Sequence, residues 1–151
     1  MTMNEYVLAL CLAVLEVANP AKPADRAMSV CYTVGEAADR RGASVEIAIA
    51  LAYTESRLNP KAASDRRARG ALQVIPVWHC PGRRERGCDL IEAGIGALLR
   101  YERKYGPRWE DILCHWSQGN GCWSVGRRFA RTVMDRADLF RHASMTVWGD
   151  E

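Results

Sequence analysis

Glu55 is the residue whose type and position point most directly to acid–base chemistry. It lies near the end of an apolar segment, AIALAYTES over residues 48–56, that is expected to be helical. A carboxylate at the C-terminus of a helix is electrostatically unfavourable. If the side chain packs against aliphatic neighbours, it loses solvation and its pKa rises towards neutrality, as a general acid requires. The alternative is a Glu55 side chain that faces water on the last helical turn.

The six cysteines are more than a cytosolic enzyme of this size usually carries. Their even number indicates disulfides and an oxidising compartment. Cys114 and Cys122 are close enough in the sequence to close one loop, although buried free thiols are an alternative. No CxxC pair is present and the only histidines are His79, His115 and His142, so neither a metal site nor an organic cofactor is expected.

The chain has 151 residues and a formal charge of +3, which suits one globular domain. Arginines cluster within residues 66–69, 83–86 and 127–131. A basic surface can bind nucleic acid or an anionic polymer such as the cell wall, but solvated helix faces and loops are the simpler interpretation. Nucleic-acid binding is not expected, because no known DNA- or RNA-reading motif is present.

The elements that would position Glu55 are predicted to be helices. Ser44 is a suitable N-cap for the helix that carries Glu55, and Pro60 requires that helix to end by residue 59. Asp89 and Glu92 form a capping-box pair before a further helix. The other helices are expected at residues 26–40, 90–105, 109–116 and 124–140. No segment alternates as a strand does, so the prediction is an all-α domain with at most a minor β element.

Residues 6–18 form the only long apolar run, too short to span a membrane. Its length suits the core of a signal peptide, but no Lys or Arg precedes it and Glu16 interrupts it. Leu8, Leu12 and Leu15 fall on one helical face, so an ordinary first helix is the preferred interpretation. Pro20 and Pro23 then mark a linker. We therefore divide the chain into an N-terminal helix or signal-like segment with its linker, residues 1–25, and a main domain, residues 26–151.

A more specific signal begins at Glu55, where the sequence reads ESRLNPKAASDRRARGALQVIP. It resembles the signature of lytic transglycosylases with a soluble-transglycosylase type of lysozyme-like domain. That signature is a glutamate and a serine, then Asn-Pro, a serine, Gly-Ala-x-Gly, a glutamine and a proline. The matching residues are Glu55, Ser56, Asn59, Pro60, Ser64, Ala68, Gly70, Gln73 and Pro76. The sequence departs from the family at Arg67, where glycine is usual, and at Ala71-Leu72, where Leu-Met is usual.

The similarity extends beyond this motif, from about residue 31 to residue 133. Residues 88–106 resemble the family's helix Asn-Ile-x-x-Gly-x-x-Tyr-Leu, with Gly94 at the glycine, where a small residue lets another helix approach closely. Residues 112–121 resemble the segment that normally contains Ala-Tyr-Asn-Ala-Gly. Trp116 stands at its tyrosine and Ser117 replaces its asparagine. FARTV, from Phe129, resembles the family's closing helix.

The subgroup that the chain resembles most consists of small transglycosylases of secretion and conjugation systems, and a phage-encoded member is equally compatible. The resemblance implies a Cys31–Cys88 disulfide, with Cys114–Cys122 as the second pair and Cys11 and Cys80 unassigned. It implies peptidoglycan as the substrate, and secretion, conjugation or virion proteins as further partners. The expected location is the periplasm or a phage virion.

The implied reaction is non-hydrolytic cleavage of the MurNAc-β-1,4-GlcNAc bond, which leaves 1,6-anhydro-MurNAc ends. Glu55 would be the single catalytic acid and base. Ser64 and Gln73 are expected to hydrogen-bond the substrate, and Ser56 to hold the end of the catalytic helix. Trp116 would place its ring against a sugar, with Ser117 beside it.

Two alternatives remain open. A hydrolytic lysozyme of the same fold would need a second acid, and Asp65 is the candidate near the motif. A non-catalytic wall-binding or structural protein could also have kept the fold. Four further tryptophans are expected to be core residues: Trp78, Trp109, Trp123 and Trp148.

Overall fold

The fold was analysed in a computed structural model, which describes the backbone of residues 1–149 and the side chains of residues 1–146. The helices are α1 (Met3–Val17), α2 (Ala24–Arg40), α3 (Val45–Ser56), α4 (Pro76–His79), α5 (Leu90–Tyr105), α6 (Trp109–Gln118) and α7 (Ser124–Gly149), with a 3₁₀ turn at Pro81–Arg83. Over this range the only β structure is two isolated bridges, Ala63 with Arg69 and Arg69 with Val74. The prediction of an all-α fold with a minor β element is confirmed.

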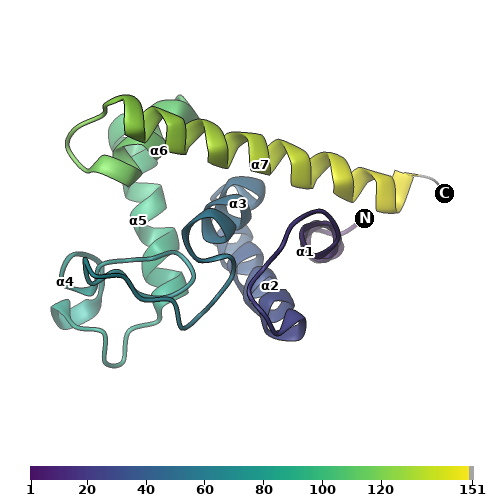
Figure 1. The fold of residues 1–151 in the computed structure, drawn as a ribbon, viewed down its shortest axis with the longest axis horizontal. Coiled ribbons are helices and arrows are strands. Elements are labelled where there is room, and N and C mark those ends of the chain that lie inside the picture. Colours follow the sequence, from purple (N-terminus) through teal and green to yellow (C-terminus); the bar gives the residue numbers. More distant parts are fainter. Residues whose placement is uncertain (150–151) are drawn as a thin grey trace.

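Helix α3 lies in the middle of the molecule, with α1 and α2 on one side, α5 on the other and α7 running across them (Figure 1). Apart from Glu46, its side chains from Val45 to Ala52 are all buried. The Ser44 hydroxyl accepts a hydrogen bond from the Ile47 amide, as the N-cap prediction requires. The helix ends at Ser56, before Pro60, and therefore carries Glu55 from the core to the surface in its last turn.

Helix α1 contributes Val7, Leu10 and Val14 to the same hydrophobic core as α2 and α3. The ordinary-helix interpretation of its apolar run matches this packing. A disulfide joins Cys11 of α1 to Cys31 of α2. The prediction of a Cys31–Cys88 disulfide is therefore wrong, because α1 packs over the face of α2 that presents Cys31.

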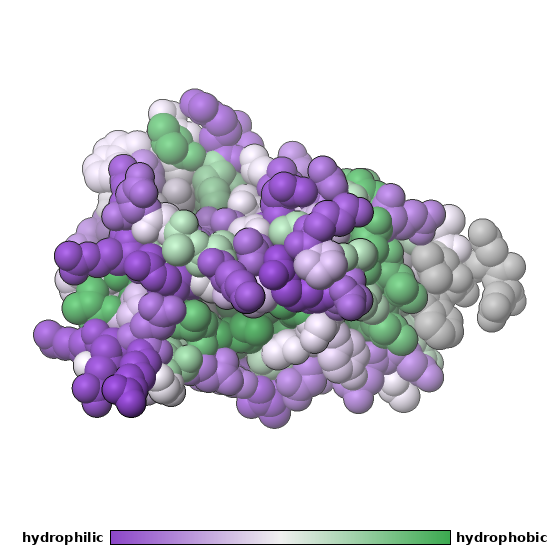
Figure 2. Space-filling view, turned by 60° about the horizontal axis from the view of Figure 1, so that its bottom comes forward, coloured by the Kyte–Doolittle hydropathy of each residue, from purple (hydrophilic) through white to green (hydrophobic). Residues whose placement is uncertain are grey.

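None of the helices in the described range is long and apolar enough to cross a membrane. Figure 2 shows a mostly hydrophilic face, with hydrophobic residues exposed towards the end of the molecule that carries the two termini. The exposed large apolar side chains of that region include Leu8, Leu12 and Val17 of α1 and Leu139 and Met145 of α7.

Helix α7 is longer than predicted, since it continues past Phe140 to Gly149. No glycine or proline interrupts the chain between Gly126 and Gly149. Its buried residues Ala130, Val133, Ala137 and Phe140 pack along α6, α3 and α1. The short helix α4 was not predicted, because its four residues are too few to show a helical period.

Candidate active site

A pocket of about 780 Å³ opens beside the C-terminal end of α3. Its walls come from five segments: the end of α3, the loop and short helix at residues 64–79, helix α5, the end of α6 with its following loop, and the start of α7. The lining residues are Glu55, Ser64, Arg66, Ala68, Gln73, Ile75, Trp78, His79, Arg100, Tyr101, Trp116, Ser117, Gly119, Asn120 and Phe129. The pocket therefore contains most of the residues predicted for the site.

Glu55 is the only carboxylate among these lining residues. Burial raises the pKa of Glu55 to about 7, and the hydrogen bond that it accepts from Trp116 works in the opposite direction. In that bond the Trp116 Nε1 lies 3.2 Å from the Glu55 Oε2. The side chain thus lies at the water-exposed pocket but is poorly solvated, and near neutral pH it can both donate and accept a proton.

Ser56 holds the end of α3 in place rather than lining the pocket. Its hydroxyl lies within hydrogen-bond distance of the Ala52 and Ala71 carbonyls, at 3.0 and 2.7 Å. The second contact joins the helix that carries Glu55 to the loop that carries Gln73. Arg57 caps α3 in a left-handed conformation, and its Nε donates to the Asn19 carbonyl in the linker before α2.

The loop after α3 presents Ser64 and Gln73 to the pocket. The Ser64 hydroxyl accepts hydrogen bonds from the Arg66 and Ala68 amides, each at 3.2 Å. The Gln73 Nε2 donates to the Ala62 and Gly70 carbonyls, at 3.1 and 2.9 Å. These bonds hold both side chains in position, and the Gln73 amide oxygen takes no part in them. The structure brings Ser64 and Gln73 together with Glu55, as predicted.

Helix α5 forms the wall behind this loop, and the two lie close together at Gly94. A Cβ at Gly94 would lie only 2.5 Å from the Leu72 Cδ1. The close approach expected at this glycine is confirmed, but the neighbour is the loop at Leu72 and not another helix. About two helical turns later, Tyr101 contacts Trp116 edge to face, with ring centroids 5.8 Å apart.

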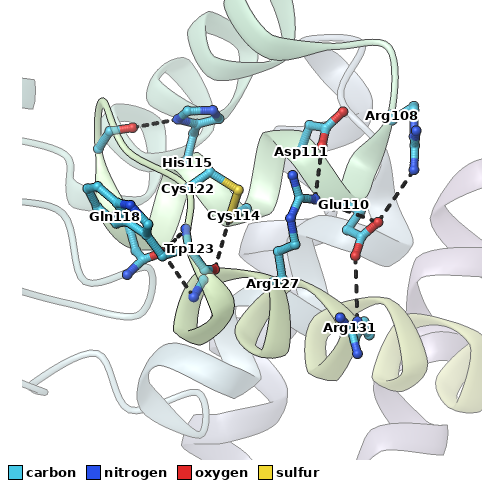
Figure 3. Close-up of a disulfide and its surroundings, with 12 residues drawn as sticks. Arg108, Glu110, Asp111, Cys114, His115, Gln118, Cys122, Trp123, Arg127 and Arg131 are labelled. Atoms are coloured by element: carbon cyan, nitrogen blue, oxygen red, sulfur yellow. Dashed lines mark hydrogen bonds and ion pairs between the residues drawn. A yellow bond between two sulfur atoms is a disulfide. The ribbon is translucent and has the colours of Figure 1, made fainter.

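The end of α6 brings Trp116 and Ser117 to the opposite side of the pocket. A disulfide between Cys114 and Cys122 closes this loop, so that prediction is confirmed (Figure 3). Within it, the Gln118 Oε1 accepts hydrogen bonds from the Trp123 and Gly126 amides and so caps the start of α7. The third disulfide, Cys80–Cys88, closes the loop that follows α4.

Ion pairs between α6 and α7 fix the base of the same loop. Arg127 of α7 lies 3.2 Å from Asp111, and Arg131 lies 3.5 Å from Glu110 (Figure 3). The prediction for the arginines at 127–131 as solvated helix residues is thus refined, because two of them join helices.

The prediction for the other tryptophans is partly wrong. Trp78 is 76% exposed and lines the pocket, and Trp123 is 64% exposed. Trp78 belongs to the short helix α4 and Trp123 to the loop between α6 and α7, so both lie outside the helical core. Trp109 is half-buried and packs against the core, as predicted. Trp148 lies outside the residues whose side chains are described.

Sequence reasoning also missed Arg66, Arg100, Tyr101 and Asn120 as pocket residues. The arginine cluster was the only signal for Arg66, and nothing in the helical pattern of α5 distinguishes Arg100 from its exposed neighbours. Asp65, the second acid that a hydrolase would need, is exposed and is not among the residues that line the pocket. No three His, Cys, Asp or Glu side chains within the described range converge as metal ligands.

Comparison with known proteins supports the same interpretation. Neither the curated proteins nor the solved structures include one that matches this chain. The family model of the transglycosylase SLT domain matches residues 32–132, which include α3, the loop, α5, α6 and the pocket that they form. The chain therefore belongs to the transglycosylase SLT domain family, and it is a peptidoglycan lytic transglycosylase with a lysozyme-like catalytic domain.

Proposed function

We propose that this enzyme cleaves the MurNAc-β-1,4-GlcNAc bond without water and leaves 1,6-anhydro-MurNAc ends, with Glu55 as the single acid and base. The observation that carries the proposal is that Glu55 is the only carboxylate lining the pocket and has a pKa of about 7. Glycosidases that use water normally place two carboxylates on either side of the bond.

In the first step the protonated Glu55 donates its proton to the glycosidic oxygen as the C1–O bond breaks. In the second step the Glu55 carboxylate takes the proton from the C6 hydroxyl of the same MurNAc, whose oxygen forms the new bond to C1. The carboxyl group is regenerated and no water is consumed. Because the nucleophile belongs to the substrate, the reaction needs no protein nucleophile and benefits from its proximity.

Five other side chains are proposed to hold the strand. Gln73 and Ser64 line the pocket, and the Gln73 amide oxygen and the Ser64 hydroxyl suit the amide and hydroxyl groups of the sugars. The Trp116 Nε1 donates its hydrogen bond to Glu55, and the indole ring contributes an aromatic surface to the pocket wall. Trp78, exposed at the pocket, provides a second aromatic surface for a sugar ring. Ser117, also at the pocket, is proposed as a further polar contact.

The direct test compares wild type with Glu55→Gln on purified peptidoglycan and weighs the released muropeptides by mass spectrometry. The proposal expects products ending in 1,6-anhydro-MurNAc from wild type and a loss of at least about 100-fold in the variant. Products heavier by one water would identify a lysozyme instead, and Asp65→Asn would then be the next variant. No products from wild type on walls that a control enzyme digests would favour a wall-binding protein.

The proposed setting is outside the cytoplasm, either in the periplasm or in a phage virion. Peptidoglycan lies there, and three disulfides suit an oxidising environment. Secretion, conjugation or virion proteins remain the proposed partners.

A further inference from the structure

Two arginines line the pocket without an acidic partner. Arg66 lies in the loop after α3 and Arg100 lies on α5, so the two side chains reach the pocket from different walls. In the part of the chain whose side chains are described, neither forms an ion pair. The neighbouring Arg69, in contrast, pairs with Glu85. Two positive charges at the pocket are therefore available to a ligand.

The pocket contains little negative charge to balance them. Glu55 is its only carboxylate, and it is close to half protonated at neutral pH because of its raised pKa. His79 adds no positive charge there, since burial and the nearby Arg100 lower its pKa. The pocket around the scissile bond is therefore cationic at neutral pH.

The sugar rings, hydroxyls and acetamido groups of a glycan strand are uncharged. They need hydrogen-bonding groups and aromatic surfaces, which Gln73, Ser64 and Trp116 supply. Guanidinium groups instead match carboxylates, with which they form paired, charge-assisted hydrogen bonds. The groups of peptidoglycan that carry carboxylates are its peptide stems and, where a stem has been removed, the lactyl group of MurNAc.

We propose that Arg66 and Arg100 form a carboxylate-binding subsite, which makes the enzyme prefer glycan strands whose peptide or lactyl carboxylates are free. This inference rests on the proposed function, because it assigns a substrate class to the same pocket. Recognition is then divided between neutral contacts with the sugars and charged contacts with their substituents.

The test uses three forms of one peptidoglycan preparation. The first is native, the second has lost its stems to an amidase and keeps the lactyl carboxylate, and the third has all carboxylates converted to amides with carbodiimide and ammonium ions. The pocket variant is Arg66→Gln with Arg100→Gln. The matched control is Arg103→Gln with Arg128→Gln, which removes the same charge from two exposed helical arginines that do not line the pocket.

Wild type and the control are expected to cleave native peptidoglycan about fivefold faster than the amidated form at low substrate concentration, whereas the pocket variant cleaves both at the same low rate. A preference for native over amidated peptidoglycan identifies the stem carboxylates, since the lactyl group of the native form is in amide linkage. Amidase-treated strands that wild type cleaves as fast as native ones, with a loss in the pocket variant, show that the subsite also binds the free lactyl carboxylate. Equal cleavage of native and amidated walls by wild type, or equal losses in the pocket and control variants, would overturn the proposal.

Binding separates this inference from the proposed function. In a Glu55→Gln background, which does not cleave the strands, the protein is sedimented with native and with amidated peptidoglycan. Stronger binding to the native form that disappears with Arg66→Gln and Arg100→Gln supports the subsite even if wild type releases no products. Equal binding to both forms contradicts the subsite, even if the products carry 1,6-anhydro ends.

Discussion

The Trp116 Nε1 donates a hydrogen bond of 3.2 Å to the Glu55 Oε2, across 61 positions of the sequence. Glu55 comes from α3 in the centre of the fold, and Trp116 comes from α6 on the other side of the pocket. The bond favours the charged carboxylate, whereas burial favours the neutral acid, and burial has the larger effect on the pKa. The pair therefore sets the protonation state on which the proposed reaction depends.

We predict that Trp116→Phe moves the alkaline limb of the pH–rate profile to higher pH. The wild-type rate should fall as Glu55 loses its proton above a pH of about 7. Loss of the indole donor raises the pKa of Glu55 further, while the smaller ring and missing bond lower the maximal rate by about tenfold. The measurement is kcat/KM from pH 5 to 9.

The control is Trp123→Phe, whose ring is exposed outside the pocket, and its alkaline limb should stay in place. A shift of the limb in both variants would exclude an effect specific to Trp116.

Glu55 should also make the free energy of unfolding depend on pH. Its pKa is about 7 in the folded protein and near 4.5 in an unfolded chain, so the folded protein binds more protons between these values. Stability must then decrease as pH rises through this window. Glu55→Gln removes the effect, and its stability relative to wild type should rise by up to about 3 kcal/mol from pH 4 to pH 8. Denaturant unfolding at four pH values measures this difference, and a constant difference would show that Glu55 is not desolvated.

Two buried glycines of α5 are predicted to respond to alanine in opposite ways. A Cβ at Gly94 would lie 2.5 and 2.8 Å from the Leu72 Cδ1 and Cβ. Gly94→Ala should therefore lower the free energy of unfolding by about 1–3 kcal/mol and displace Gln73, which follows Leu72 in the loop. At Gly96 the nearest atoms, 3.4 to 3.5 Å away, belong to the flexible guanidinium groups of Arg41 and Arg100. Gly96→Ala should therefore stabilise the helix by about 0.5–1 kcal/mol and leave turnover of amidated strands, which do not engage Arg100, unchanged. Thermal unfolding and turnover check both; equal effects would contradict this packing.

The sequence predicted the helices and the main site residues because local signals and a motif coincided there. Ser44, Pro60 and Asp89 mark helix ends by chemistry that acts within a few residues. Ser64 and Gln73 were found through the motif, which encodes a loop whose shape no periodicity reveals. Trp78 was assigned to the core because large aromatic residues usually are buried, but its exposure depends on how α4 sits at the pocket.

The disulfides show the same limit. Cys114 and Cys122 are eight positions apart and could be paired from the sequence. The partner of Cys31 depends on which helix covers α2, which is a tertiary property. A correct choice required knowledge that α1 packs there, with Cys11 on its buried face.

We predict that the disulfides differ in what they contribute. Replacing Cys114 and Cys122 by alanine should reduce stability by about 2–4 kcal/mol and raise KM several-fold, because their loop carries Trp116 and Ser117. Replacing Cys11 and Cys31 should cost a similar stability with little change in KM, since that bond joins α1 to α2 away from the pocket. Turnover at 20 °C, where both variants remain folded, distinguishes them. Peptide mapping without reductant checks the pairing itself, and a peptide linking Cys31 to Cys88 would refute it.

Arg67 is predicted to destabilise the fold through its backbone. It replaces the usual glycine of the family motif and has a φ of +67°, in the left-handed region where a side chain costs about 1–2 kcal/mol. Replacing Arg67 by glycine removes this cost, but glycine also has greater freedom in the unfolded chain, which offsets part of the gain. Arg67→Gly should therefore stabilise the protein by about 1 kcal/mol. Arg67→Ala removes the same charge but keeps the Cβ, and it should bring no such gain.

The hydrogen bond from the Arg67 amide to the Ser64 carbonyl, 3.1 Å long, is available to all three residues, so the turn that presents Ser64 should be preserved. Denaturant unfolding of the three proteins isolates the backbone contribution; an alanine variant as stable as the glycine one would instead attribute the effect to the arginine side chain.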